Sequence, residues 1–440
     1  MTTISIANFP SQLQGIIQTG FLERQFNDGL VSKLGFRAIA DRETFPNAIG
    51  ETLTKTRRGL KAPAMTPLSP SGNTNFDNGL TSSTFSVEQY TLSINMYGDT
   101  IDLNTVTERV AIAPQFLENA RVNGVQAAQT LDRLARNALY AGYLGGNTRV
   151  RTTLGSPAAT VSVDDIRGFQ TVFNAQGQQV AVSSSNTMTV TVNGTAYTLQ
   201  GATADGSNVS TAPNGISGTL TFSANVSTTD GTAGNAVISS VAPAVFRPNA
   251  RATTKALTTG DTLDMKSVLS AVATLRSNNV PTIGGLYNAY LDDQQLLGLF
   301  QDSQFQLLFR GAYNSTEYRQ GDVFSLLGVR FIPTTEAPQQ ASLGAGAIHR
   351  AIICGSGALI EGDFAGTGAA DVATQNAITS MVDGVAMITR PPLDRLQQII
   401  AQSWYWIGGF TLPSDQTAST SILPTATNSV YKRATVIESL

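Results

Sequence analysis

The sequence contains one residue of each type that a thiol-based catalytic pair needs, Cys354 and His349. Such a pair works only when the imidazole lies within hydrogen-bond reach of the thiol. The two residues are five positions apart in a segment that reads as a β-strand, so their side chains are expected on opposite faces. We interpret His349 as a surface histidine and Cys354 as a buried cysteine. The single cysteine also leaves no partner for an intrachain disulfide.

Metal and cofactor chemistry is equally poorly supported. With one histidine and one cysteine, a zinc site would have to take its other ligands from carboxylates. Two adjacent carboxylate pairs, Asp164-Asp165 and Asp292-Asp293, leave calcium open as an alternative. We favour helix capping for Asp292-Asp293 and a turn or helix start for Asp164-Asp165. The glycine-rich stretches at 355–362 and 366–368 lack the phosphate-loop ending and the dinucleotide-loop spacing.

We therefore predict no catalytic, cofactor-binding or metal-binding residue, and we expect that the chain is not an enzyme. The remaining candidate is a basic cluster formed by Lys55, Arg57, Arg58 and Lys61. It lies in a proline-rich stretch, 46–86, that is typical of a long extended arm. The cluster has no interleaved aromatic residues, so it does not indicate single-stranded nucleic-acid binding. Docking on an acidic patch of a neighbouring subunit is the interpretation we favour, and a solvated loop is the alternative.

The composition points to a surface that neighbouring molecules cover. Charged residues make up 13% of the 440 residues, about half of the usual ~25%. A lone monomer with so few charges would be at risk of poor solubility. The net charge of −3 predicts no global attraction to DNA or to acidic membranes. The N-terminus has no signal-peptide pattern, and no apolar run is long enough for a membrane span, so we expect folding in a cytoplasm.

The first half of the chain predicts short elements followed by one long helix. Phe21 to Leu30 has helical spacing, and Phe85 to Leu103 alternates like a strand that returns from the arm. Thr105 and Glu108 fit a capping box, and Pro114 suits a first turn. An apolar stripe then predicts a helix over 115–143, which would span roughly 43 Å.

The composition changes over 151–258, where serine, threonine, glycine, valine and asparagine dominate. Two alternating runs flank Asn193-Gly194, which predicts a hairpin pairing Val192 with Thr195 and Met188 with Leu199. A further strand is expected over 220–226. We interpret this stretch as a small inserted β-domain; a Ser/Thr-rich linker without fixed structure is the alternative.

The last part of the chain reads as mixed helices and strands. A helix capped by Asp261 is expected to run until Asn278, and Trp404, Tyr405 and Trp406 are expected to anchor a core. The other expected elements are strands at 286–291, 328–335, 350–354, 384–389 and 397–410, and a helix at 292–300.

Four stretches give this order of elements a family resemblance: Leu286-Tyr-Asn-Ala-Tyr-Leu-Asp-Asp-Gln-Gln-Leu296, Leu326-Leu-Gly-Val-Arg-Phe-Ile-Pro-Thr-Thr-Glu-Ala-Pro338, Arg57-Arg-Gly-Leu-Lys-Ala-Pro63 and Asn95-Met-Tyr-Gly-Asp-Thr-Ile-Asp-Leu103. The chain resembles the major capsid proteins of tailed bacteriophages, which share the Hong Kong 97-type fold. The resemblance covers most of 20–410, and no single motif in it is as specific as a metal-binding signature. The insertion departs from the minimal fold.

The resemblance implies an α+β fold, Hong Kong 97-like, with a β-rich insertion domain. The implied parts are an N-terminal arm (1–45), an extended loop with its returning strand (46–103), the spine helix of a peripheral domain (104–150), the insertion (151–258), a peripheral-domain helix (259–281), an axial domain (282–384), closing peripheral strands (385–412) and a C-terminal tail (413–440).

The resemblance also implies what the chain does. Copies would form hexamers and pentamers that close into an icosahedral shell around double-stranded DNA, held by non-specific contact. Assembly would take place in the host bacterial cytoplasm with a scaffolding protein and a portal protein, and the product would be the virion capsid. It leaves open whether decoration proteins bind, and it involves no membrane and no cofactor. Some members cross-link a lysine to an asparagine; Lys55 and Lys61 lie in the corresponding loop, but we predict no cross-link.

Three other classes compete with this interpretation. An encapsulin-like nanocompartment shares the fold but encloses protein cargo, and it would rarely need a β-insertion. A β-rich surface adhesin would explain 151–258, but the export signal it needs is missing. An enzyme would need the catalytic set that the sequence lacks.

Overall fold

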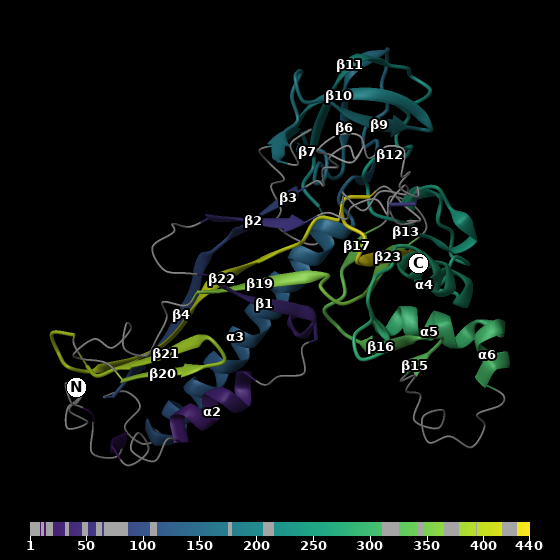
Figure 1. Cartoon of the computed structure of the whole chain (residues 1–440). Helices are drawn as coiled ribbons and strands as arrows, with labels where there is room; N and C mark the ends of the chain where they lie inside the picture. Colours follow the sequence, from purple (N-terminus) through teal and green to yellow (C-terminus); the bar gives the residue numbers. More distant parts are fainter. Residues whose placement is uncertain are drawn as a thin grey trace, which may run out of the picture. The chain divides into compact units, whose positions relative to one another are not determined.

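The structure is a computed structural model, and it combines runs of consecutive strands with a few helices in an α+β arrangement, as the sequence predicts (Figure 1). The chain forms two compact units, the first from residues 1–53, 91–136 and 359–411, the second from 54–90, 137–358 and 412–440. Each unit is described by itself. The described residues are 9, 13–14, 21–30, 35–45, 52–58, 64–65, 87–105, 112–174, 178–205, 215–309, 325–341, 346–364, 378–392, 394–415 and 429–440.

A six-stranded sheet organises the first unit, with strand order β1-β19-β22-β21-β20 and β4 paired to β22. Its strands are β1 (Ala40–Phe45), β4 (Asn95–Asn104), β19 (Leu359–Phe364), β20 (Ile378–Val382), β21 (Val385–Arg390) and β22 (Ile399–Thr411). β1 runs parallel to β19, whereas the other pairings are antiparallel. The ladder of β4 with β22 extends over ten residue pairs, so these two strands form the longest continuous pairing of this sheet.

The helices of this unit are α2 (Phe21–Leu30), the short 3-10 helix η2 (Arg37–Ile39) and the part of α3 (Ile112–Tyr143) that precedes Asn137. α3 confirms the long helix expected over 115–143, with Pro114 in its first turn. The capping box expected at Thr105 and Glu108 stays a prediction. Thr105 lies in a turn after β4, and Glu108 lies outside the described residues.

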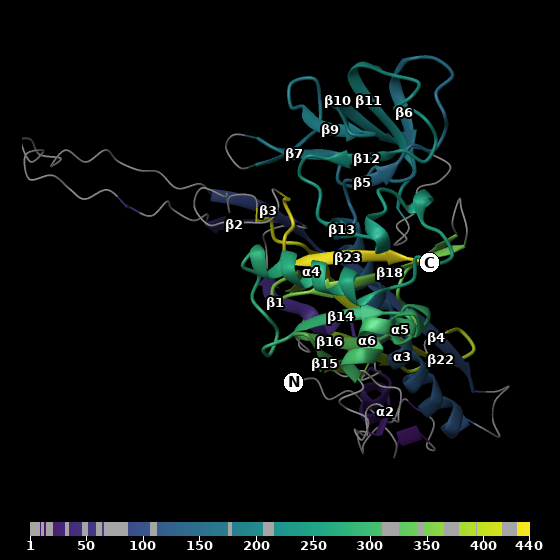
Figure 2. The same ribbon diagram turned by 90° about the vertical axis from the view of Figure 1, so that its right-hand side faces the viewer.

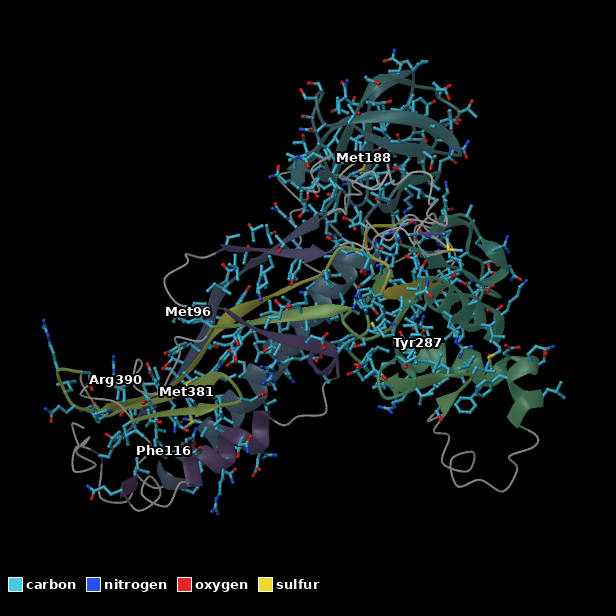
Figure 3. The ribbon with its side chains drawn as sticks, in the orientation of Figure 1. Met96, Phe116, Met188, Tyr287, Met381 and Arg390 are labelled. Carbon is cyan, nitrogen blue, oxygen red and sulfur yellow. The ribbon has the colours of Figure 1, made fainter. Side chains whose placement is uncertain are left out.

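The core of the first unit forms where α3 packs on the sheet. Phe116, Leu131 and other members of the predicted stripe are buried together with Trp404 and Trp406 of β22. Trp404 Nε1 donates a hydrogen bond to Gln126 Oε1 on α3, 3.1 Å away. Figure 3 labels Phe116 among these side chains. The aromatic segment therefore anchors a core, as the sequence predicts.

The single strand that was expected to return from the arm is divided into two strands. β3 (Val87–Ser93) pairs with β2 (Thr52–Arg58) in a separate two-stranded ribbon, and β4 begins only at Asn95. The alternation continues through both strands, which is why the sequence pattern does not show the break.

A seven-stranded sheet organises part of the second unit, with strand order β13-β23-β18-β14-β16-β15 and β17 paired to β18. Its strands are β13 (Val245–Phe246), β14 (Tyr287–Leu291), β15 (Ser325–Leu326), β16 (Val329–Pro333), β17 (Gln339–Ala341), β18 (Ala347–Cys354) and β23 (Ala434–Ser439). The helices are η4 (Pro248–Ala250), η5 (Thr254–Ala256), α4 (Met265–Ser277), α5 (Asp293–Gln301) and α6 (Ser303–Phe309). Leu275 of α4, Tyr287 of β14 and Ile437 of β23 share one apolar core.

The two helix caps expected here have different outcomes. Asp292 caps α5 and accepts a hydrogen bond from the Gln295 amide at 2.9 Å, as predicted. The cap of α4 is Asp264, not Asp261. Asp261 is instead buried and accepts from Asn249, Arg251 and Thr258. Both residues precede an apolar-periodic run, so spacing alone does not distinguish them.

The C-terminal segment differs from the expected tail. β23 pairs antiparallel with β18 over six residues and parallel with β13, and all six of its residues are buried. Six residues give too short a run for periodicity to indicate a strand in the middle of a sheet.

The serine- and threonine-rich stretch folds as a small barrel. Its strand order is β5-β12-β9-β10-β11-β6, and an isolated bridge between Val150 and Val163 joins the two outer strands (Figure 2). The strands are β5 (Asn147–Arg149), β6 (Ala158–Val163), β9 (Met188–Val192), β10 (Thr195–Ala204), β11 (Gly218–Val226) and β12 (Ala236–Ser239); β7 (Thr171–Phe173) and β8 (Gln179–Ala181) form a separate ribbon. The register of the Asn193-Gly194 hairpin is the predicted one, with Val192 opposite Thr195 and Met188 opposite Leu199.

The barrel interior gives a test of how firmly this stretch is folded. Leu220→Ala removes a fully buried side chain of β11, and it should lower the free energy of opening the barrel by about 2–5 kcal/mol. Its exposed neighbour Thr221 is the matched control, because Thr221→Ala should change that free energy by less than about 1 kcal/mol. Amide hydrogen exchange of the barrel strands measures both. Equal effects of the two substitutions would contradict a packed interior.

Candidate functional site

The predicted assembly residues lie on the ribbon formed by β2 and β3. Lys55, Arg57 and Arg58 belong to β2, and Lys61 lies outside the described residues. The side chain of Lys55 is half-buried, while those of its neighbours Thr54 and Thr56 are exposed. The structure thus brings three of the four basic residues onto one strand.

The ribbon is anchored at one end only, within the described residues. Leu53 of β2 packs on a small cluster made by Leu92 and Ile94, together with Phe364 and Ile407 of the first unit's sheet. An isolated two-stranded ribbon has little stability of its own in water. The chemistry available here is therefore recognition, through backbone edges and a strand whose sequence carries three basic residues.

A second polar site holds the N-terminal segment on the first unit's sheet. Arg37 Nη2 lies 2.7 Å from Glu361 Oε1, and Arg37 Nη1 lies 2.9 Å from Asp383 Oδ2. Arg42 Nη1 reaches the other oxygen of Asp383 at 2.7 Å. Glu361 is 1% exposed, so Arg37 neutralises a carboxylate that burial would otherwise penalise. We call Arg37, Arg42, Glu361 and Asp383 the β1 clamp, since it fixes the strand that follows Arg37.

The clamp shifts the acidity of the carboxylates around it. Burial acts to raise the pKa of Asp383, but its hydrogen bond with Arg42 and the charge of Arg37 lower that pKa overall. Asp363 lies beside the clamp, but no such hydrogen bond lowers its pKa. Burial and the charge of Glu361 raise the pKa of Asp363. The clamp's arginines therefore favour an ionised Asp383, whereas burial is the main reason that the pKa of Asp363 is raised.

No signal in the sequence pointed to this clamp. Arg37 and Glu361 are 324 positions apart, and Arg37 and Asp383 are 346 apart. Single arginines and acids are ordinary surface residues in a sequence pattern. The register of β1 with β19 sets Arg42 opposite Glu361, while Arg37 in η2 and Asp383 in the turn after β20 come from other elements.

The one histidine is not a surface residue, which corrects the sequence interpretation. His349 is buried, and its Nδ1 contacts Asp292 Oδ2. Burial acts to raise the pKa of Asp292, but hydrogen bonds from His349 and from the Gln295 amide lower it overall. The sequence interpretation placed His349 on the surface because a strand pattern does not reveal that a helix cap lies next to this residue.

Cys354 is buried, as predicted, and burial raises the pKa of its thiol far above the ordinary value. The thiolate, which is the nucleophilic form, is therefore disfavoured. Within the described ranges, no group of three or more histidine, cysteine, aspartate or glutamate side chains could hold a metal ion. Asp164 and Asp165 are instead ion-paired with Arg149 and Arg167.

The glycine-rich turn at 355–357 joins β18 to β19, with Gly357 at a φ of +70° that favours glycine. The second glycine-rich stretch, 366–368, lies outside the described residues. No helix in the described part of the chain is both long and apolar enough to cross a bilayer.

Comparison with known proteins gives likenesses in structure only. No protein-family model matches the sequence, and no curated protein does. Among solved structures, the chain is similar to the capsid of Ralstonia phage GP4, with 10% identity and a TM-score of 0.49, covering 91% of this chain and 87% of that one. It is also similar to the capsid of Cyanophage P-SCSP1u (11% identity, TM-score 0.46, 91% and 86% covered) and to the Cyanophage Pam1 capsid asymmetric unit (12%, 0.45, 89% and 86%).

The β1 clamp predicts a local response to acid. A carboxyl group whose pKa is lowered by folding stabilises the fold at pH values above its ordinary pKa. This contribution is lost as the pH falls through the lowered pKa. Amide exchange of residues 40–45 should therefore accelerate as the pH falls below about 4, after correction for the intrinsic rate. Asp383→Asn should show faster exchange already at pH 7 and a weaker pH response. Unchanged protection in this variant would contradict the role of Asp383 in the clamp.

Proposed function

We propose that this chain is a major capsid protein, a structural subunit that forms hexamers and pentamers and closes an icosahedral shell around double-stranded DNA. The observation that carries the proposal is the order in which the chain supplies its elements. An N-terminal strand, a two-stranded ribbon, a 32-residue helix, a β-barrel, a mixed sheet with short helices and closing strands follow one another. This is the order that the capsid resemblance implies, element by element. The likeness to solved capsids agrees with it but, at TM-scores below 0.5, does not carry it.

The energetics of the ribbon support a role in assembly. Ordering the backbone of a residue costs roughly 1–2 kcal/mol, and the ribbon's described apolar anchor is the cluster at its base. A neighbouring subunit could offset that loss by covering the ribbon and pairing with its edges. We propose that Lys55, Arg57, Arg58 and Lys61 dock on an acidic patch of that neighbour.

Exposed apolar residues support contacts between copies as well. Leu297 on α5 is 51% exposed and Leu307 on the adjoining α6 is 60% exposed. Together with a charged fraction of 13%, they give a surface that is better suited to burial by neighbours than to a lone monomer. A scaffolding protein, a portal protein and assembly in a host bacterial cytoplasm belong to the same proposal.

Electron microscopy of the chain, expressed alone and with its neighbouring genes, tests this function. We expect uniform icosahedral shells, and nucleic acid inside shells from infected cells. Deletion of 46–86 should abolish shells and leave a folded monomer, because the ribbon contributes little to either compact unit. Circular dichroism and sedimentation check the monomer. Normal shells from the deletion would overturn the role of the ribbon, and protein cargo in place of DNA would favour a nanocompartment.

Charge reversal tests the basic cluster more narrowly. The triple variant Lys55→Glu, Arg57→Glu, Arg58→Glu should raise the subunit concentration needed for assembly by at least about tenfold, since each lost contact to an acidic partner weakens association. Arg151→Glu is a control for charge reversal elsewhere on the chain, because Arg151 is an exposed arginine of the barrel paired with Asp205. Light scattering across a concentration series gives the threshold. An equal threshold for the triple variant and the wild type would exclude electrostatic docking.

A further inference from the structure

The tight turn that joins β15 to β16 carries a leucine where comparable turns of this chain carry other residues (Figure 1). Four two-residue turns in the described part of the chain connect paired residues and have a positive φ at both central positions. They are Asn193-Gly194, Gly284-Gly285, Leu327-Gly328 and Asp383-Gly384. Asparagine, aspartate and glycine are the residues that adopt this left-handed backbone most readily. Leu327, with a φ of +57°, is the exception among the four.

The leucine is strained at this position, and the chain alone gives it little burial in return. The left-handed backbone brings Cβ close to the following carbonyl oxygen, and leucine has no polar group for a local hydrogen bond. Leu327 is 37% exposed, whereas Val329 and Phe331 of the adjoining strand β16 are buried in the core of the sheet. Strain that persists at an exposed apolar residue points to a function outside the isolated chain.

A second tight turn lies beside Leu327 at the same end of the sheet. β14 and β16 run parallel, with Tyr287 opposite Val329, so the Gly284-Gly285 turn that precedes β14 is placed next to the Leu327-Gly328 turn. The Tyr287 amide donates a hydrogen bond to the Gly328 carbonyl at 2.9 Å, which ties the two turns together. The two turns therefore present one surface.

This turn surface is apolar and has a positive charge at its side. Ile283 and Leu286, which flank the glycine turn, are both half-buried. The exposed Arg276 comes from the last turn of α4. Its guanidinium lies against the leucine turn, because a Cβ on Gly328 would lie 2.6 Å from Arg276 Nη2. A partner that fits this surface has apolar side chains and a carboxylate.

Helices α5 and α6 of the same chain have these features. Leu297 on α5 is 51% exposed and Leu307 on α6 is 60% exposed. Neither helix contains a lysine or an arginine, and Asp293 is exposed at the start of α5. α5 begins beyond the C-terminal end of β14, whereas Leu327 lies at the other end of that strand. The two surfaces are therefore distinct.

We propose that Leu327 is a contact residue between subunits, and that a second copy of this chain covers it with the α5–α6 surface. Two different surfaces then meet head to tail, an arrangement that closes into a ring when the rotation between copies allows it. Burial of the leucine would offset the strain of its turn, and Arg276 would face Asp293 of the second copy. This inference rests on the proposed function, since it needs copies that assemble.

The test separates the stability of the subunit from its assembly. Leu327→Asn puts a residue that suits the turn in place of the strained leucine. Below the concentration needed for assembly, its unfolding temperature should rise by about 1–3 °C, because the strain is relieved. The subunit concentration needed for assembly should rise at least about tenfold, because the apolar contact is lost. Thermal unfolding and light scattering across a concentration series measure the two quantities.

Two control variants distinguish the contact from a general effect of substitution. Leu327→Met keeps both the strain and the apolar side chain, so it should match the wild type in stability and in assembly. Leu269→Gln changes a leucine of α4 that is 44% exposed. Because Leu269 lies outside both surfaces, the concentration needed for assembly should stay within about twofold of the wild type.

A double-mutant cycle tests the α5–α6 surface. The paired substitution Leu297→Gln, Leu307→Gln should also raise the concentration needed for assembly at least about tenfold. Adding Leu327→Asn should then have little further effect, because residues that share one contact are not additive. Fully additive effects would overturn α5–α6 as the covering surface.

The outcomes separate this inference from the function on which it rests. If the wild type forms shells and Leu327→Asn forms them at the same concentration, the inference is wrong and the proposed function stands. A lower unfolding temperature of Leu327→Asn would show that the leucine stabilises the chain itself, which also overturns the inference. A wild type that never associates, alone or with its neighbouring genes, would contradict the proposed function and this inference together.

Discussion

The first unit depends on β22, because this one strand pairs with β4, β19 and β21 at the same time. It joins chain segments that are separated by some three hundred positions, and it places Trp404 and Trp406 against α3. Two glycines near its end allow this packing. A Cβ on Gly409 would lie 1.9 Å from the carbonyl oxygen of Ser93, and a Cβ on Gly408 would lie 2.3 Å from the Trp406 ring. Since such separations are far inside contact distance, no larger residue fits without moving the strand.

Local chemistry explains which parts of the fold were predictable. α3, the Asn193-Gly194 hairpin and the Asp292 cap each follow from residues within a few positions of one another, and each was found where expected. A helix stripe or a two-residue turn has a fixed spacing, so the sequence contains the information directly. The α+β class, by contrast, was implied by the family resemblance.

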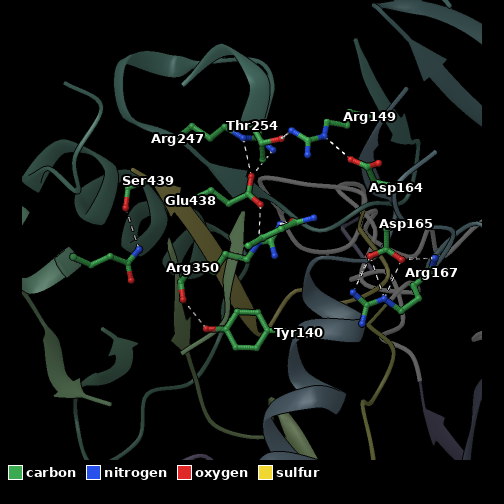
Figure 4. A network of polar contacts seen from close by, with 12 residues as sticks. Tyr140, Arg149, Asp164, Asp165, Arg167, Arg247, Thr254, Arg350, Glu438 and Ser439 are labelled. Atoms are coloured by element: carbon green, nitrogen blue, oxygen red, sulfur yellow. Dashed lines mark hydrogen bonds and ion pairs between the residues drawn. The ribbon is translucent and has the colours of Figure 1, made fainter. Parts of the chain in front are cut away.

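The parts that were missed depend on contacts between distant segments. β23 is a strand because β18 and β13 offer it free edges, and six residues alone do not reveal that. His349 is buried because β18 passes the cap of α5, and the β1 clamp needs the register of β1 with β19. The buried pairs of Glu438 with Arg247 and Arg350 likewise join residues that lie far apart in the sequence (Figure 4). The sequence placed the candidate assembly residues in an extended arm, but it did not predict the strand β2, which holds three of them, or the apolar contact of Leu53 at its base.

The barrel and the ribbon differ in how far the backbone N–H and C=O groups of their outer strands are hydrogen-bonded. This difference affects where a neighbouring molecule can bind. The bridge between Val150 and Val163 closes the barrel, so its outer strands β5 and β6 pair with each other at that point. A sheet offers no edge to a partner strand where it is closed in this way. The ribbon of β2 and β3 has only two strands, so each has an outer edge without a ladder partner in the described part of the chain. Backbone groups on such an edge gain from pairing with another chain. Under the proposed function, the ribbon is therefore the element whose backbone is best suited to contacts between copies.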